Sequence, residues 1–342
     1  MHAKPIRFAI AVLFAAVALV QTQGQSQGQT PSQSERVFQF TYTQAPQGLK
    51  EIANAIRGAA ELTQASLNAD AKTLTVDGTP TQIAIAAWLF SELDQPAPSN
   101  QATKEYRPAG SVNDVIRIFY QSHIQGPQNF QEIVNAVRTV PEMTKIFPYF
   151  GQNAVVMRGT DSQAAMTEWL FHQLDVPAGV QPVQSLPAHQ YVSPGATNDE
   201  VQVLFLTRSM SPQSMQQIVN TIRVIPQLTK VFPITAPGAV SVRGPTATIA
   251  LAAWLFSQLD QAPQSSSPPP QQFQMPGGAD DVTQVFYLSP ATTIAAFQSI
   301  VATLRTVTKL VFPDDMFNAV TLRGTAAQIA SADLLFKQMN NP

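Results

Sequence analysis

Histidine and cysteine are the side chains that most often bind metals or activate nucleophiles at neutral pH. The sequence has no cysteine and four histidines, His2, His123, His172 and His189. No two histidines have the spacing of a metal site, and none recurs between the repeated blocks described below. The glycine motifs of phosphate-binding loops, dinucleotide folds and nucleophile elbows are absent as well. We therefore predict no enzyme activity, no catalytic residue, no metal and no cofactor.

Three aspartates do recur, each at the end of an apolar helix and before a proline-rich segment. Carboxylates at equivalent positions could take part in acid–base chemistry. An acidic residue at a helix boundary is more commonly solvated, and this is the interpretation that we adopt. The three are Asp94, Asp175 and Asp260.

Four arginines also recur. Each follows the last residue in the apolar pattern of the first helix of a repeated block, which is described below. One interpretation is that the aliphatic stem packs along the helix while the guanidinium stays in water. The other is a contact with a protein partner, because arginine is enriched at interfaces. The sequence leaves both open, and the candidate partner-interface residues are Arg57, Arg138, Arg223 and Arg305.

These residues recur because a whole block of sequence recurs four times. In its clearest copy we expect a helix over Met215–Ile225 and a helix over Thr246–Asp260, with two strands between them, Leu228–Thr235 and Ala239–Arg243. Another strand precedes the first helix. The copies end their last strand on a glycine at nearly equal intervals, which is typical of a tandem array. The four glycines are Gly78, Gly159, Gly244 and Gly324.

The apolar pattern within the block predicts its fold. The first helix has apolar residues at i, i+3, i+4 and i+7, one stripe of a helix that lies on a sheet. Counted back from the glycine, the preceding strand is apolar at the fourth and second positions and charged at the first. We therefore expect the strand to have one buried and one solvent-exposed face. The predicted fold class is α+β, with four small βαββα modules, each a three-stranded sheet with two helices on one face. Ile218, Ile222, Val240, Val242 and Phe256 should be buried.

The ends and junctions complete the predicted organisation. Cations and a thirteen-residue apolar run, Phe8 to Val20, predict a signal peptide at 1–20, and hence an exported, periplasmic protein. Gln/Ser/Gly-rich residues 21–35 predict a disordered tether. Pro/Gln/Ser-rich linkers would join the modules. The modules, called repeats 1 to 4 below, are predicted at 36–94, 112–175, 198–260 and 280–342.

An aromatic residue stands at a fixed distance before three of the repeats, within the linkers. A pure spacer does not require an aromatic ring at a constant register. We therefore expect each ring to pack on a repeat, namely the one that follows it. The three residues are Tyr106, Tyr191 and Phe273.

The order βαββα, the phrase LNADAKTLTVDGTP at 67–80 and the closing Leu93-Asp94 resemble the periplasmic N-domain repeats of bacterial secretins. Secretins form the outer-membrane pores of type II and type III secretion and of type IV pili. The sequence carries no counterpart of their barrel domain, so their pore function is not carried over. The resemblance implies an envelope protein that docks or oligomerises, accessory to a secretion or pilus system, with an outer-membrane secretin as one candidate partner.

Two other functions stay open at this point. Secretin N-domains share a topology with KH domains, which bind nucleic acids. No G-x-x-G loop occurs, however, and the net charge is −2, so we expect no nucleic-acid partner. A cell-wall or carbohydrate-binding protein would need a cleft, and the sequence shows no small-molecule substrate. The leading hypothesis is protein docking or self-association.

Overall fold

The computed structural model describes residues 33–96, 102–123, 126–177, 189–207, 210–261, 268–278, 280–289 and 292–340. The predicted signal peptide at 1–20 and most of the tether at 21–35 lie outside these residues. The first strand begins at Ser34, inside the segment assigned to the tether. No helix within the described residues is long and apolar enough to cross a membrane.

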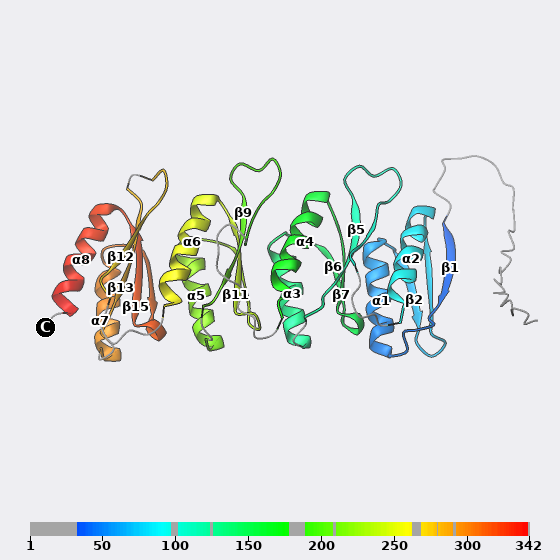
Figure 1. The fold of residues 1–342 in the computed structure, drawn as a ribbon, viewed down its shortest axis with the longest axis horizontal. Helices are drawn as coiled ribbons and strands as arrows, with labels where there is room; N and C mark the ends of the chain where they lie inside the picture. Colours follow the sequence, from blue (N-terminus) through cyan, green and yellow to red (C-terminus); the bar gives the residue numbers. More distant parts are fainter. Residues whose placement is uncertain are drawn as a thin grey trace, which may run out of the picture. The chain divides into compact units, whose positions relative to one another are not determined.

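The described residues form four modules in series, each an antiparallel sheet with two helices on one of its faces (Figure 1). The α+β class and the order βαββα are thus confirmed. The helices are α1 (Pro46–Ala59), α2 (Pro80–Leu93), α3 (Pro127–Thr139), α4 (Asp161–Leu174), α5 (Pro212–Val224), α6 (Thr246–Leu259), α7 (Ile294–Leu304) and α8 (Ala326–Asn340).

Each sheet places the strand before its glycine in a central position, between the first strand of the repeat and the hairpin partner. In repeat 1 the order is β1-β3-β2, and these strands are β1 (Ser34–Gln39), β2 (Gln64–Asn68) and β3 (Thr73–Gly78). The corresponding trios in repeats 2 to 4 are β5 (Val115–Tyr120), β6 (Lys145–Tyr149) and β7 (Ala154–Gly159); β9 (Glu200–Phe205), β10 (Lys230–Ile234) and β11 (Ala239–Gly244); and β13 (Val282–Tyr287), β14 (Leu310–Asp314) and β15 (Ala319–Gly324). Short 3-10 helices precede β7 and β15, at Phe150–Gln152 and Asp315–Phe317.

The predicted strand number is too low in repeats 2, 3 and 4. There the linker phrase with the recurring aromatic residue forms a fourth strand at the sheet edge, antiparallel to the first strand of the repeat that follows. Three or four residues next to proline and glycine are too short to show a period of two, so the sequence pattern did not reveal them. The added strands are β4 (Lys104–Tyr106), β8 (Gln190–Val192) and β12 (Gln271–Gln274).

The helices begin and end where local chemistry predicts. Thr79 and Thr160 form capping boxes with glutamines three residues later, satisfying the first amides of α2 and α4. Helices α3 and α5 each end two residues before a proline, Pro141 and Pro226. The apolar stripes then pack on their own sheets, and the predicted core of repeat 3 is confirmed. The exposed fractions of Ile218, Ile222, Val240, Val242 and Phe256 are at most 2%.

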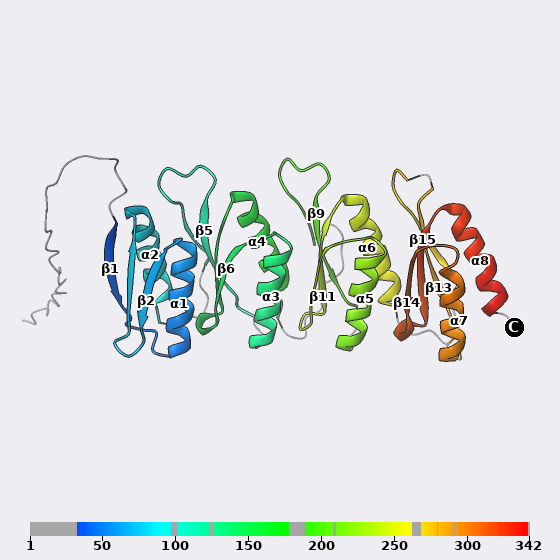
Figure 2. The same cartoon turned by 180° about the vertical axis from the view of Figure 1, so that it is seen from behind.

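The other face of the sheet is buried too, except in repeat 1. In repeats 2 to 4 this face lies against the helices of the preceding repeat (Figures 1 and 2). Ala154, Val156, Ala239 and Ser241, which point away from their own helices, are each 0% exposed. The prediction of a solvent-exposed second face is therefore wrong for these three repeats, because a neighbouring repeat covers it.

Candidate functional site

The four predicted interface arginines lie at equivalent, exposed places in the structure. Arg57, Arg138 and Arg223 stand in the last turn of α1, α3 and α5, and Arg305 caps the end of α7. Arg223 donates from Nη2 to the carbonyl of Val231 in its own repeat, at 2.8 Å. All four residues are exposed. Their role as a partner surface remains a prediction.

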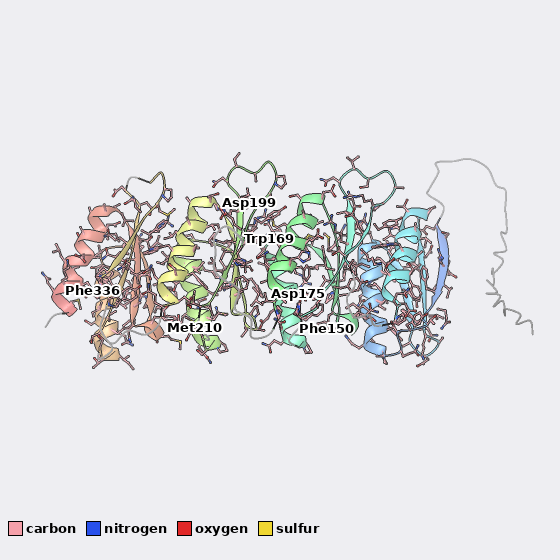
Figure 3. The ribbon with its side chains drawn as sticks, in the orientation of Figure 1. Phe150, Trp169, Asp175, Asp199, Met210 and Phe336 are labelled. Atoms are coloured by element: carbon pink, nitrogen blue, oxygen red, sulfur yellow. The ribbon has the colours of Figure 1, made fainter. Side chains whose placement is uncertain are left out.

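A second series of arginines, the charged residues before the glycines, makes the contacts between repeats. Arg243 forms a bidentate ion pair with Asp199 of its own repeat, with Nε at 3.0 Å from Oδ1 and Nη2 at 2.6 Å from Oδ2. Its remaining Nη1 donates to the carbonyl of Val140, at the end of α3 in repeat 2, at 2.9 Å. One guanidinium therefore joins two repeats (Asp199 is labelled in Figure 3).

The same geometry occurs at the other two junctions. Arg158 pairs with Asp114, with Nη2 at 2.5 Å from Oδ2, and donates to the carbonyl of Ala59 at 2.7 Å. Arg323 pairs with Asp281 at 2.7 Å and donates to the carbonyl of Ile225 at 3.0 Å. We call this arrangement the arginine clasp; its residues are Arg158, Asp114 and Ala59; Arg243, Asp199 and Val140; and Arg323, Asp281 and Ile225.

The guanidinium of the clasp is chemically suited to its acceptor, a backbone carbonyl at the end of a helix. The last carbonyls of a helix have no partner within the helix and carry the negative end of its dipole, so a guanidinium both satisfies and neutralises them. The aspartate fixes the guanidinium in a bidentate geometry that lysine could not reproduce. Hydrogen bonds from Arg243 and Arg323 hold the pKa of Asp199 and of Asp281 below its usual range. Both carboxyls are therefore ionised at neutral pH.

Ion pairs flank the first two clasps. Lys145 and Arg158 meet Glu61, and Lys230 meets Glu142 at 2.8 Å. Glu61 and Glu142 follow their helices in the left-handed region, with φ of 54° and 60°, which turns each side chain towards the next repeat. At the third junction the corresponding residues are Gln227, with φ of 62°, and Leu310, so this pair is absent there.

Apolar surface fills the junctions beneath the clasps. Ile116, Ile118 and Tyr149 of repeat 2 belong to the core cluster of repeat 1, and Val201, Val203 and Phe205 of repeat 3 belong to that of repeat 2. The approach is close at the first junction. A Cβ atom on Gly58 would lie 2.1 Å from the ring of Phe147, so any larger residue there would force the ring to move.

The recurring linker aromatics also join repeats. Tyr106 packs on Trp88 with ring centroids 5.2 Å apart, while its backbone pairs with β5. Tyr191 on Trp169 and Phe273 on Trp254 repeat this contact, each at 5.5 Å (Trp169 is labelled in Figure 3). The expectation that these rings pack on a repeat is confirmed, but the ring contacts the preceding repeat and only the backbone pairs with the following one.

The interpretation of the recurring aspartates as solvated is wrong. Asp94 is 5% exposed, and its carboxylate accepts the backbone N–H groups of Thr41 and Thr43 at 2.7 and 2.8 Å. Asp175 accepts from Ser122 and His123, at 2.9 and 2.7 Å (Figure 3), and Asp260 from Thr207 at 2.7 Å. Each carboxylate ties the end of the second helix to the loop after the first strand, a structural role.

Repeat 1 lacks the apolar sheet face and the clasp arginine through which repeats 2 to 4 contact the preceding repeat. Where repeat 2 presents Ile116, Ile118 and Val156, the equivalent positions of repeat 1 hold Glu35, Val37 and Thr75, and Asp77 replaces the clasp arginine. Val37 is 56% exposed. The sequence did show this difference, because three of the four residues before the glycines are arginine and one is aspartate. What it could not show is the neighbouring helix that the arginines reach.

Among the described residues, no group of three or more histidine, aspartate or glutamate side chains could hold a metal ion. His123 lies beside Asp175, and His189 contacts Gln173.

No protein-family model matches the sequence, and no curated protein does. Solved secretins are similar at low levels. The N-terminal domain of the secretin XcpQ from Pseudomonas aeruginosa is 14% identical over 42% of this chain and 62% of that chain, with a TM-score of 0.19. ExeD from Aeromonas hydrophila is 11% identical over 86% and 60%, with a TM-score of 0.16. This chain spans less than two thirds of either structure, and such scores establish neither its family nor its function.

Proposed function

We propose that this chain is a non-enzymatic, exported envelope protein whose repeats form a scaffold for protein docking or oligomeric assembly. The observation that carries the proposal is the arginine clasp, which occurs with the same geometry at three successive junctions. The recurring polar side chains of the repeats, Arg158 and Asp94 and their counterparts, serve contacts between protein segments. An enzyme would instead gather such groups around a cleft.

The resemblance of the repeats to secretin N-domains and the apolar run near the N-terminus support the envelope setting. An accessory role in a secretion or pilus system follows from that resemblance, with an outer-membrane secretin as the candidate partner. The near-neutral balance of charge gives no support to nucleic acid as the partner.

The partner surface that we propose is the row of exposed helix ends bearing Arg57, Arg138, Arg223 and Arg305. The junctions use the other arginine series, so this row is left at the surface. Exposed guanidinium groups at a regular interval fit a partner with carboxylates at a matching interval, since arginine binds carboxylate in a bidentate fashion.

Light scattering after size exclusion, together with cross-linking to a purified secretin, tests the proposal. We expect the chain to self-associate or to form a complex with the secretin. Arg57→Glu with Arg138→Glu should weaken that association at least tenfold. Lys50→Glu with Lys309→Glu, an equal change of charge at exposed residues, is the matched control and should leave it unchanged. A strictly monomeric chain that cross-links to no secretin would overturn the docking proposal, and equal effects of both pairs would overturn the assignment of the arginine row.

A further inference from the structure

Repeat 3 contains a cavity of about 510 Å³ between its sheet and α6. The cavity runs beside α6 from Thr246 to Ser257, a length of roughly 16 Å at 1.5 Å per residue. Its other walls are β8 and the helix-facing side of β9. A cavity of this size can hold a small organic molecule.

The cavity exists because repeat 3 departs from its neighbours along one strand face. In repeat 2, Arg117 fills the equivalent place and bonds Glu105 and Glu168, at 2.7 and 2.6 Å. In repeat 4, Gln284 does so, bonded to Gln272 at 2.8 Å and to Asp333 at 3.5 Å. In repeat 3 these positions hold Gln202, Gln190 and Ala253. The two glutamines match those of repeat 4, so the short side chain of Ala253, in place of Glu168 or Asp333, is the change that leaves the space open.

Two further differences on the same face of β9 distinguish the cavity of repeat 3 from the other repeats. Repeats 1, 2 and 4 stack two phenylalanines between strand and second helix, as in Phe119 on Phe171 with centroids 5.1 Å apart. Repeat 3 has Leu204 opposite Phe256, which removes one ring. At the start of the strand, repeats 2 and 4 have a buried valine, Val115 and Val282, whereas repeat 3 has Glu200.

Glu200 is 5% exposed and lines the cavity. Burial raises the pKa of this carboxyl, while hydrogen bonds with Gln190 and Thr246 act in the opposite direction. The described lining of the cavity contains no lysine or arginine. Enlarging a cavity and burying a carboxyl both reduce the stability of a domain, and repeat 3 combines the two. A bound cation would supply the positive counter-charge that no lysine or arginine of the described lining provides to Glu200.

We propose that this cavity is a binding site for a small organic cation, an ammonium or amidinium group joined to an apolar body. Glu200 pairs with the cationic group, as the carboxylates of repeat 2 pair with the guanidinium of Arg117. Trp254 and Phe256 enclose the apolar body, and these aromatic walls add attraction for a cation. Gln190 and Gln202 supply amide groups that orient the bound molecule.

Calorimetric titration of the full chain at pH 8 with 4-phenylbutylamine, and with 4-phenylbutanol as its neutral counterpart, tests this site. We expect one amine to bind per chain, at least tenfold more tightly than the alcohol. Glu200→Val places the residue of the neighbouring repeats in the cavity and should lower the affinity for the amine to that for the alcohol. Gln202→Arg with Ala253→Glu rebuilds the ion pair of repeat 2, fills the cavity and should abolish binding of both.

Circular dichroism shows whether each variant keeps the fold, and Glu200→Gln provides a second removal of the charge that changes no volume. Three results would overturn the proposal: no saturable binding of the amine at millimolar concentration, equal affinities for amine and alcohol, or unchanged affinity in a folded Glu200 variant.

Discussion

Asp314 is a buried carboxyl at the contact between repeats 3 and 4, and it predicts a specific dependence of stability on pH. It is 0% exposed, and its equivalents in repeats 2 and 3 are the buried Tyr149 and Ile234. Burial raises its pKa to about 7, and the neighbouring charge of Asp315 adds to this effect. The hydroxyl of Thr221, which donates to the carbonyl of Gln217 at 3.0 Å, also donates to Oδ2 of Asp314 at 3.4 Å and acts on this pKa in the opposite direction.

The sign of the effect follows from proton binding. The folded state holds the Asp314 proton more tightly than the unfolded state, whose pKa is 3.8. Stability from this group is therefore fully present below that value and is lost as the pH rises through about 7. A pKa difference of about three units corresponds to about 4 kcal/mol at most, at about 1.36 kcal/mol per unit. The depressed pKa values of Asp199 and Asp281 act oppositely, since their contribution is lost as the pH falls.

Asp314→Asn isolates the effect, because the amide has a similar shape and carries no charge. At pH 5, about one unit above the unfolded-state pKa of 3.8, the variant should already be more stable than the parent chain by about 1.5 kcal/mol, and at pH 8 by about 4 kcal/mol. Urea unfolding followed by far-ultraviolet circular dichroism from pH 5 to 8 measures this difference. Asp315→Asn, at the exposed neighbour, is the control and should change the profile only slightly. Parallel profiles of Asp314→Asn and the parent across this range would refute the reasoning.

Three further substitutions test the packing of the repeats. Arg243→Ala removes the clasp at the second junction and should destabilise the chain by about 1–3 kcal/mol. Arg243→Lys should recover less than half of this loss, because lysine cannot bond Asp199 and the Val140 carbonyl together. Hydrogen exchange at the end of α3 measures the loss of stability, and an unchanged exchange rate would contradict the role of the clasp. Asp94→Asn should cost about 1–3 kcal/mol, because it weakens the bonds to the N–H groups of Thr41 and Thr43; urea unfolding would show an unchanged midpoint if these bonds are unimportant. Ile222→Ala empties a fully buried site and should cost about 2–5 kcal/mol, seen as a lowered melting temperature, whereas an unchanged melt would mean that the helix face is misplaced.

Periodicity was sufficient to predict the fold class because each element repeats four times in the sequence. The stripe through Ile218 and Ile222 has the period of a helix, and the alternation through Val240 and Val242 has that of a strand. Capping residues such as Thr79 and prolines such as Pro141 then placed the helix ends. These signals are local, and the structure differs little from them.

The contacts between repeats could not be predicted in the same way. The alternation through Val240 and Val242 shows which side of β11 faces its own helices, but it cannot show whether Ser241 and Arg243 on the other side meet water or another repeat. Asp94 at the end of a helix has the same local sequence whether it is solvated or accepts buried amides. The cavity beside Glu200 could have been suspected, because a glutamate stands where two other repeats have valine.

The third junction combines several differences that the first two do not share. The ion pairs of Glu61 with Lys145 and of Glu142 with Lys230 are replaced there by Gln227 and Leu310. Glu51 and Glu132 accept backbone N–H groups across their junctions, at 2.9 and 2.7 Å, whereas the equivalent Gln217 bonds the side chain of Asp315 at 3.2 Å.

Its charged groups include the clasp of Arg323, Asp315 and the buried Asp314. The clasp is ionised at neutral pH, while Asp314 loses its proton near pH 7 and is then a buried anion. The missing ion pair makes this junction weaker than the other two at neutral pH, and the titrating carboxyl weakens it further as the pH rises. The sequence of the segment that leads into repeat 4, rich in proline and serine, independently predicts a long spacer there. Of the three junctions, the one between repeats 3 and 4 should therefore open first above neutral pH.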